Sequence, residues 1–227
     1  METRKENILK SVVESYIDTA EPVGSKFLVE KGGIDASGAT VRNDMRDLEE
    51  EGFLTHPHTS AGRIPTEMGY QYYVDHVMKE KAVQKKVQED ITALCGLDTD
   101  KNKILKSIGK YVADVAHNAV IIAFSRDSVY YTGMSHLFAQ PEFQDMAYMV
   151  NVSTLFDHCE ERIEQVYDLV HTIEPNIFIG TKNPLGILAS TVVGKIDNES
   201  LFAILGPTRM NYAENFSFID YIQKTLH

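Results

Sequence analysis

The sequence predicts an α+β fold: an N-terminal winged helix-turn-helix domain followed by a C-terminal domain of mixed strands and helices. Three helix-like segments precede residue 52, and a glycine-containing turn separates the second from the third. A proline-bounded hairpin follows. Further along, apolar strand-like runs alternate with helical segments, which favours a mostly antiparallel sheet flanked by helices. We expect a winged helix in residues 1–78, a helical connector in 79–103 and a sheet domain in 104–227.

The first two helices are predicted by apolar spacing and by residues that stop a helix. Pro22 ends the first segment, residues 4–18. We expect the second helix around GSKFLVEK, with Phe27 and Leu28 facing inward and a glycine pair at its end. The first helix carries one apolar face at helical spacing, formed by Ile8, Leu9, Val12, Val13, Tyr16 and Ile17.

The third helix is expected in the segment GATVRNDMRDLEEEGF. Ser37 is well placed as its N-cap, because a serine hydroxyl can accept a hydrogen bond from a free backbone amide. Val41, Met45 and Leu48 recur at i, i+4 and i+7 and form its buried stripe. Gly52 ends the helix.

The stretch HPHTSAGRIPTEMGYQYYVDHV, residues 56–77, predicts a stiff hairpin and then a helix. FLTHPH and RIP would be two short strands joined by the turn TSAG, a wing beside the third helix. Pro57 and Pro65 stiffen the hairpin and Gly62 lets it turn. Thr66 caps a helix that docks the wing onto the body through Tyr70, Tyr73, Val74 and Val77.

The C-terminal half alternates between strand-like and helix-like patterns. Residues 79–103 are rich in Lys, Glu, Gln and Asp, so we expect a solvated helix and connector, followed by an amphipathic helix over 104–115. We expect strands in AVIIAFS, SVYYTGMS, NIFIGT, GILASTVVGKI and SLFAILGP. We expect helices in PEFQDMAYMV, VSTLFDHCEERIEQVYDLVHTI and NFSFIDYIQKTLH.

Composition limits the class of protein. The 227 residues suit one large domain or two small ones, and 43% hydrophobic and 24% charged residues are ordinary for a globular protein. No apolar run approaches the ~18–20 residues of a membrane span. METRKENILKSVV, at the N-terminus, contains no apolar h-region and no small-residue cleavage site, so we do not expect export. Cys95 and Cys159 lie outside any CxxC spacing, so we expect reduced thiols in a cytoplasmic protein.

Net charge opposes nucleic-acid binding, but the placement of the cations favours it. The chain carries a net charge of −11, and acidic side chains also outnumber basic ones in the first eighty residues. The outward face of the third helix nevertheless suits a major groove. Arginine can pair with guanine, asparagine with adenine, and a threonine methyl can pack on thymine. The face comprises Ala39, Thr40, Arg42, Asn43 and Arg46, while Asp44, Asp47 and Glu49–Glu51 are expected to point elsewhere or toward solvent.

Further contacts are expected around this helix. Arg63 on the wing would reach a minor groove or a phosphate, and the hydroxyls or amides of Thr59 and Ser60 would meet phosphate oxygens. Ser25 and Lys26, at the start of the second helix, would contact the DNA backbone. The predicted DNA-binding residues are therefore Ser25, Lys26, Ser37, Ala39, Thr40, Arg42, Asn43, Arg46, Thr59, Ser60 and Arg63. The alternative is an ordinary solvated helix face; the two preceding helices and the wing favour DNA binding.

Two blocks of sequence resemble the bacterial heat-inducible transcription repressor family, HrcA. The N-terminal block is EPVGSKFLVEK with SGATVRNDMRDLEEEGFLTHPHTSAGRIPTEMGYQYYVD, and the late blocks are GMSHLFAQPEF and LGPTRMNYAENFSFIDYIQKTL. The resemblance is strong over residues 4–78, moderate over 118–227 and weak in the connector. It implies a repressor of chaperone operons that binds an inverted-repeat operator as a homodimer. It also implies a GAF-like C-terminal domain and support by the GroE-type chaperonin.

The sequence departs from this family in two places. Family members are longer, and NAVIIAFSRDSVYYTGMSHLF runs almost directly from the first sheet strand into the late block. The segment usually inserted there, which includes a dimerising element, is missing, so the dimer contact is open. Gly38 also replaces a bulkier or hydroxyl residue of many members.

Rival functions find less support in the residues. The histidines form no HExxH or other metal-type cluster, no GxSxG, P-loop or GxGxxG is present, and we expect neither catalysis, nor a metal, nor a cofactor. A regulator that senses a small molecule or a protein and controls other genes is the alternative. The residues that could line its pocket are more typical of core: Ile122, Phe124, Tyr131, Phe178 and Phe202. A protein-binding adaptor would leave Arg42, Asn43 and Arg46 unexplained.

Overall fold

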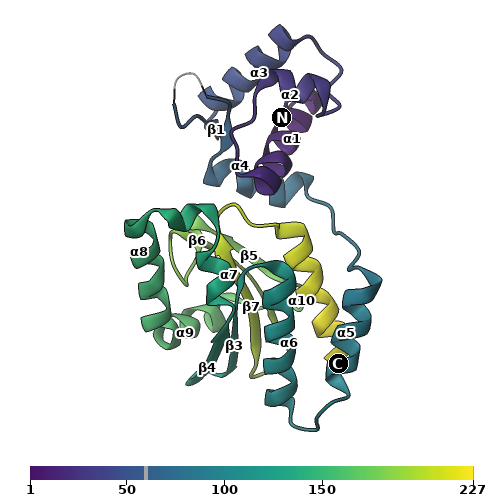
Figure 1. Ribbon diagram of the computed structural model, residues 1–227, viewed down its shortest axis with the longest axis vertical. Coiled ribbons are helices and arrows are strands. Elements are labelled where there is room, and N and C mark those ends of the chain that lie inside the picture. The colour runs from purple at the N-terminus through teal and green to yellow at the C-terminus, as the bar shows by residue number, and fades with distance from the viewer. Residues whose placement is uncertain (59–60, 227) are drawn as a thin grey trace. The chain divides into compact units, whose positions relative to one another are not determined.

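A computed structural model describes residues 1–58 and 61–226 of the chain. They form two compact units, Met1–Lys79 and Glu80–His227 (Figure 1). The structure confirms the α+β fold class, with a winged helix in the first unit and a mixed sheet-and-helix domain in the second. Within the described residues, no helix is both long enough and apolar enough to cross a membrane.

The first unit contains the three expected helices and a two-stranded wing. Leu28 is fully buried as expected, but Phe27 is 38% exposed, because the short α2 turns only one side toward the core. In α3, the Ser37 hydroxyl accepts a hydrogen bond from Thr40 N at 3.1 Å. The elements are α1 Thr3–Thr19, α2 Ser25–Glu30, α3 Gly38–Glu50, β1 Leu54–Thr55, β2 Ile64–Pro65, α4 Glu67–Tyr72 and the π-helical turn η1 Tyr73–Val77.

The buried faces of α1 and α3 meet as their spacing predicts. In α1, Ile8, Leu9, Val12 and Val13 are each fully buried. In α3, the buried stripe consists of Val41, Met45 and Leu48. These two helices pack on each other and on α2.

The wing differs from the expected two-strand hairpin, because a third backbone segment joins it. Val23 pairs with Arg63 through two backbone hydrogen bonds of 2.8 and 2.9 Å. A Cβ on Gly62 would lie 2.5 Å from the Val23 carbonyl carbon and 2.7 Å from that of Pro22. We expected Gly62 to permit a turn. Its backbone does not adopt a positive φ, and the structure requires glycine there because two chain segments approach closely.

Helix α4 anchors the wing to the rest of the unit, as the tyrosine-rich segment predicts. Thr66 caps it by accepting from Gly69 N at 3.1 Å, while its own hydroxyl donates to Gly52 O at 2.6 Å. The phenol of Tyr73 donates to Glu14 of α1 at 3.2 Å. Burial and the neighbouring Glu14 carboxylate raise the pKa of Tyr73. Thr66 therefore joins the end of the wing to Gly52, just before the wing, and Tyr73 of η1 ties the segment after the wing to α1.

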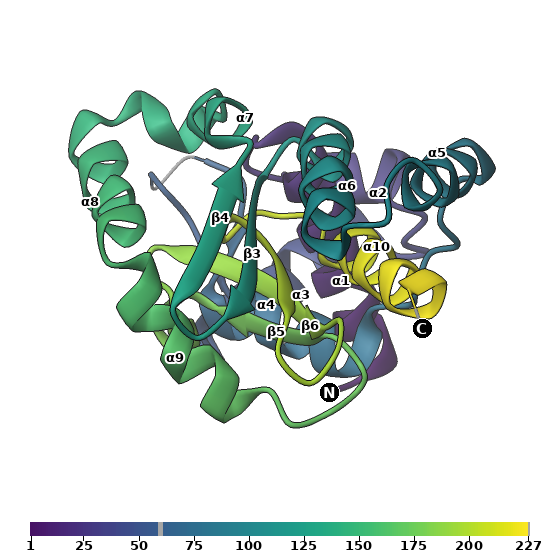
Figure 2. The ribbon, with the colours of Figure 1, turned by 90° about the horizontal axis from the view of Figure 1, so that it is seen from below.

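The second unit is a sheet covered by helices on both faces. The sheet is five-stranded and antiparallel, with the order β4-β3-β7-β6-β5. Helices α5, α6 and α10 lie on one side of it and α7, α8 and α9 on the other (Figure 2). The elements are α5 Lys85–Cys95, α6 Lys101–Ala116, β3 Ala119–Ser125, β4 Ser128–Thr132, α7 Met134–Phe138, η2 Pro141–Gln144, α8 Met146–Asp157, α9 Cys159–Leu169, β5 Asn176–Ile179, η3 Gly180–Lys182, β6 Ala189–Lys195, β7 Leu201–Pro207 and α10 Tyr212–Leu226.

Residues 79–103, which we expected to form a solvated connector, include a helix that packs on the second unit. Val87 and Ile91 of α5 are buried, because α5 lies against α6 and α10. Lys85, Lys86 and Glu89 of this helix are exposed, whereas Asp90 is half-buried and accepts a hydrogen bond from the Tyr111 hydroxyl of α6 at 2.8 Å. In the sheet, Ile122 and Phe202 are fully buried as core residues, whereas Tyr131 is 44% exposed.

Candidate nucleic-acid interface

The outward face of α3 gathers the side chains that the sequence predicts for reading DNA. Ala39, Arg42, Asn43 and Arg46 are exposed and recur every three or four residues, so they share one side of the helix. Thr40 is half-buried, and its hydroxyl lies 2.9 Å from that of Ser37. This exposed face is opposite the Val41, Met45 and Leu48 stripe.

Arg42 has no carboxylate partner among the described residues. Arg46, one turn further along α3, lies 3.7 Å from Glu50 and is 63% exposed. Arg4 hydrogen bonds to Asp44 at 2.6 Å, and this bond raises the pKa of Arg4. The charge of Arg42 is therefore not neutralised within this unit, and it is available to a phosphate or a guanine.

Asp44 lies on another face of α3, as we expected, but it points into the protein and not toward solvent. It is 5% exposed and its partner, Arg4, comes from the start of α1. Its position three residues after Val41 and four before Leu48 places it on the buried stripe, and this spacing could have shown it. The ion pair removes an acidic group from the exposed face of α3.

The start of α2, the middle of α3 and the wing share one concavity. Its volume is about 330 Å³, and Ser25, Arg42 and Arg63 line it together with Gly24 and Gly62. Segments from three separate parts of the sequence thus place two guanidinium groups and a hydroxyl around one opening. This size and chemistry suit a phosphate group of a DNA backbone.

Arg63 is less free than the sequence suggested. Its Nε lies 2.7 Å from Glu49 Oε2, its Nη1 donates to Ala61 O at 3.3 Å, and its side chain is 23% exposed. His56 Nδ1 also contacts the Glu49 carboxylate. Glu49 therefore connects the end of α3 to both strands of the wing. Periodicity could not have shown this role, because the three groups are brought together by the hairpin.

Two further predicted site residues, Ser25 and Lys26, lie at the start of α2. Lys26 is 86% exposed, 3.8 Å from Glu30, and Ser25 is half-buried at the start of α2. Thr59 and Ser60, expected at the tip of the wing, lie outside the described residues. Among the residues that the structure does describe, no group of three His, Cys, Asp or Glu side chains could hold a metal ion.

Comparison with known proteins adds independent information. The family profile for the HrcA protein C-terminal domain matches residues 72–215. The heat-inducible transcription repressor HrcA of Cutibacterium acnes is 43% identical over 124 residues, which cover 55% of this chain and 37% of the relative. The matched segment thus spans little more than a third of that relative's length.

A second relative aligns along the whole chain. The heat-inducible transcription repressor HrcA of Thermodesulfovibrio yellowstonii is 24% identical over 337 residues, covering 100% of this chain and 97% of the relative. The alignment is longer than the 227 residues of this chain, which confirms that the chain is a short form. A crystal structure of a hypothetical protein shares the fold over 100% of this chain and 96% of its own, with a TM-score of 0.76 and 18% identity.

Proposed function

The chain belongs to the HrcA family of heat-inducible transcription repressors, and from this premise we propose that it binds double-stranded DNA through α3 and represses chaperone genes. The observation that carries the proposal is the exposed face of α3, where Asn43 is exposed and Arg42 lines an opening shared with the wing. Recognition helices contact base edges with residues near their N-termini. Such a repressor works in the cytoplasm of a bacterial cell.

The proposed mechanism is steric occlusion of an inverted-repeat operator by a homodimer. One winged helix of an acidic chain contacts few phosphates, so one copy binds weakly. Two linked copies make the second contact intramolecular and raise the overall affinity. Their recognition helices would enter major grooves about 34–36 Å apart, or a multiple of that spacing. A GroE-type chaperonin that supports folding of the repressor is part of the same proposal and rests on the family resemblance.

The test is a selection followed by a mass measurement. The full chain is used to enrich duplexes from a random library, and its mass in solution is then measured with and without the enriched duplex. We expect enrichment of an inverted repeat and two chains per duplex, with weaker binding to a duplex that carries one half-site. A chain that stays monomeric and indifferent to every duplex would overturn the proposal. That result would favour a regulator that senses a small molecule or a protein.

A further inference from the structure

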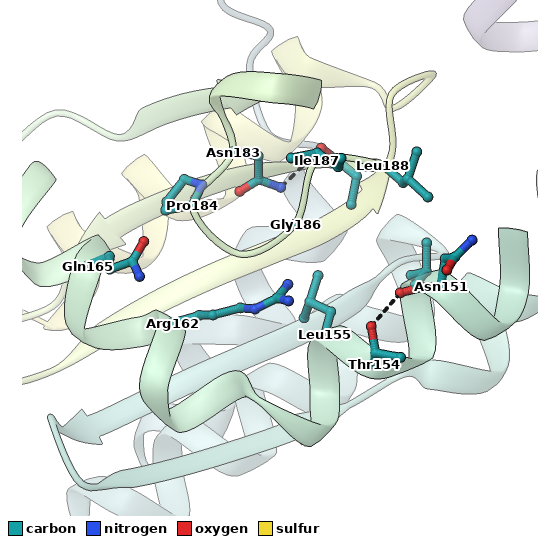
Figure 3. Close-up of a pocket in the computed structure, with 12 residues that line it drawn as sticks. Asn151, Thr154, Leu155, Arg162, Gln165, Asn183, Pro184, Gly186, Ile187 and Leu188 are labelled. Atoms are coloured by element: carbon teal, nitrogen blue, oxygen red, sulfur yellow. Dashed lines mark hydrogen bonds between the residues drawn. The ribbon is translucent and has the colours of Figure 1, made fainter.

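A concavity of about 600 Å³ opens in the second unit. Helices α8 and α9 form one wall, and the loop of residues 183–189, which leads into β6, forms the other (Figure 3). This volume is within the usual range for small-molecule sites. None of the core residues that the sequence marked as pocket candidates lines it.

Arg162 lies in this concavity without a carboxylate partner among the described residues. Its Nη1 donates to the carbonyl oxygen of Leu185, which fixes the guanidinium beneath the loop. The other arginines of the unit are neutralised: Arg126 lies 2.9 Å from Asp168, and Arg209 lies 2.6 Å from Glu142. A guanidinium has five N–H donors in a planar fork that matches a carboxylate. Arg162 therefore has donors left for a ligand.

The loop above Arg162 is held in place by the protein. Asn183 is 4% exposed, and its side chain donates to Ala189 O at 3.0 Å and accepts from Leu185 N at 3.2 Å. At Gly186, a Cβ would lie 3.3 Å from Arg162 Nη1 and 2.9 Å from Leu155 Cδ1. Glycine thus lets the loop approach the guanidinium closely. The wall is preformed, which lowers the entropic cost of binding a ligand.

The rest of the lining is mixed, with apolar side chains beside the polar ones of Asn151, Thr154 and Gln165. Leu155 lies beside the Arg162 side chain, and Leu188 and Ile187 line the loop side (Figure 3). Ile187 is 63% exposed, although a β-branched apolar side chain gains by burial. A cation without a carboxylate partner, set among apolar and neutral polar side chains, matches a ligand that has one negative charge and a hydrocarbon part. A single arginine balances a monoanion better than a doubly charged phosphate.

We propose that this concavity binds a small amphipathic carboxylate, with its carboxylate on Arg162 and its hydrocarbon part against Leu155 and Ile187. The inference does not depend on DNA binding by the first unit. It adds a ligand site to a family whose C-terminal domain matches this part of the chain.

The experiment titrates the full, isotope-labelled chain with hexanoate, octanoate and 4-phenylbutyrate, followed by backbone amide NMR shifts. The matching alcohols serve as uncharged controls. We expect saturable shifts centred on residues 151–165 and 183–189, and at least tenfold weaker binding of each alcohol. No saturable binding by any of the three carboxylates, or equal binding of the alcohols, would overturn the proposal.

Substitutions then place the ligand. Arg162→Gln should weaken carboxylate binding at least tenfold, and Arg162→Lys should restore part of it because the charge returns without the fork. Arg126→Gln is the matched control, since that arginine pairs with Asp168, and it should leave the affinity unchanged. Ile187→Ser changes an exposed residue and should weaken binding severalfold without affecting the fold. Retained affinity in Arg162→Gln would exclude this site.

Discussion

Arg42 and Arg162 are comparable groups in different surroundings. Each lacks a carboxylate partner among the described residues, whereas every other arginine lies within 4.0 Å of one. Arg42 projects from an exposed helix face, and Arg162 lies under a loop beside apolar side chains. The first environment suits a large polyanion that brings its own water and counterions. The second suits a small anion that also buries hydrocarbon.

Net charge is a poor guide to anion binding in this chain. Five of its seven arginines are paired with carboxylates close by, so they attract an outside anion weakly. What distinguishes Arg42 and Arg162 from the other arginines is the absence of a carboxylate partner among the described residues and the shape of the surface around them. The following predictions test these two features, beginning with the largest effect.

Met45→Asp tests the orientation of α3, on which the exposure of Arg42 depends. Met45 is 4% exposed, so the aspartate would be buried without a partner. We expect the first unit to lose at least ~3 kcal/mol of stability and to unfold, measured by thermal unfolding and by amide NMR of the full chain. Met68→Asp, at a residue that is 46% exposed, is the control and should be tolerated. A folded, DNA-binding Met45→Asp chain would mean that the two faces of α3 are exchanged.

Arg42→Ala and Asn43→Ala test whether the unpaired cation and its neighbour read bases. Each should lower affinity for the selected duplex by ~1–3 kcal/mol and relax base preference at one position. Fluorescence anisotropy on selected and random duplexes measures both effects, with Lys31→Ala as an exposed control. Equal losses on both kinds of duplex would show that these residues do not specify sequence.

Arg63→Ala tests an arginine of the proposed DNA-binding surface that, unlike Arg42, already has a carboxylate partner. Because Glu49 neutralises it, we expect a uniform loss of roughly 1 kcal/mol or less on all duplexes. The log–log dependence of affinity on salt should become shallower by less than the roughly one unit expected for an unpaired cation that contacts a phosphate. Anisotropy titrations at several salt concentrations give both values. An unchanged affinity would remove the wing from the interface.

Asp197→Asn tests a carboxylate with a full set of partners, as a contrast to the two unpaired arginines. Burial raises the pKa of Asp197, but hydrogen bonds from Lys101 and from the backbone amides of Glu199 and Ser200 outweigh it and lower the pKa to about 2. An unfolded aspartate titrates near ~3.9. Its stabilising contribution is therefore present above about pH 4 and is lost as pH falls toward 2.

We expect Asp197→Asn to lower the urea midpoint of the second unit slightly at pH 6, since partly exposed pairs contribute about 0–1 kcal/mol. The difference from the unsubstituted chain should shrink as pH falls below about 4, in urea titrations at pH 6, 4 and 3. A difference in the urea midpoint that stays constant over this pH range would show that the charge of Asp197 does not stabilise the turn between β6 and β7.

Much of the fold could be predicted because it depends on local patterns. The spacing of Val41, Met45 and Leu48 follows from the helical repeat, and Ser37 and Thr66 cap helices through atoms three residues away. Strands such as β3 and β7 were visible as apolar runs because the sheet buries both of its faces. The exposed face of α3 could also be predicted, because the buried stripe of a helix determines which side remains exposed.

Neighbouring residues alone determine which segments are helices, the order of the strands along the chain and the exposed face of α3. They also carry the family resemblance. The folded chain was needed to show that Asp44 pairs with Arg4, that Glu49 holds Arg63, that Gly62 touches the Pro22–Val23 backbone, and that Arg162 has no carboxylate beside it. The physical reason is distance along the sequence. A repeat of two or 3.6 residues reports which way a side chain points, but the partners of a charge come from segments that only folding brings within a few ångströms.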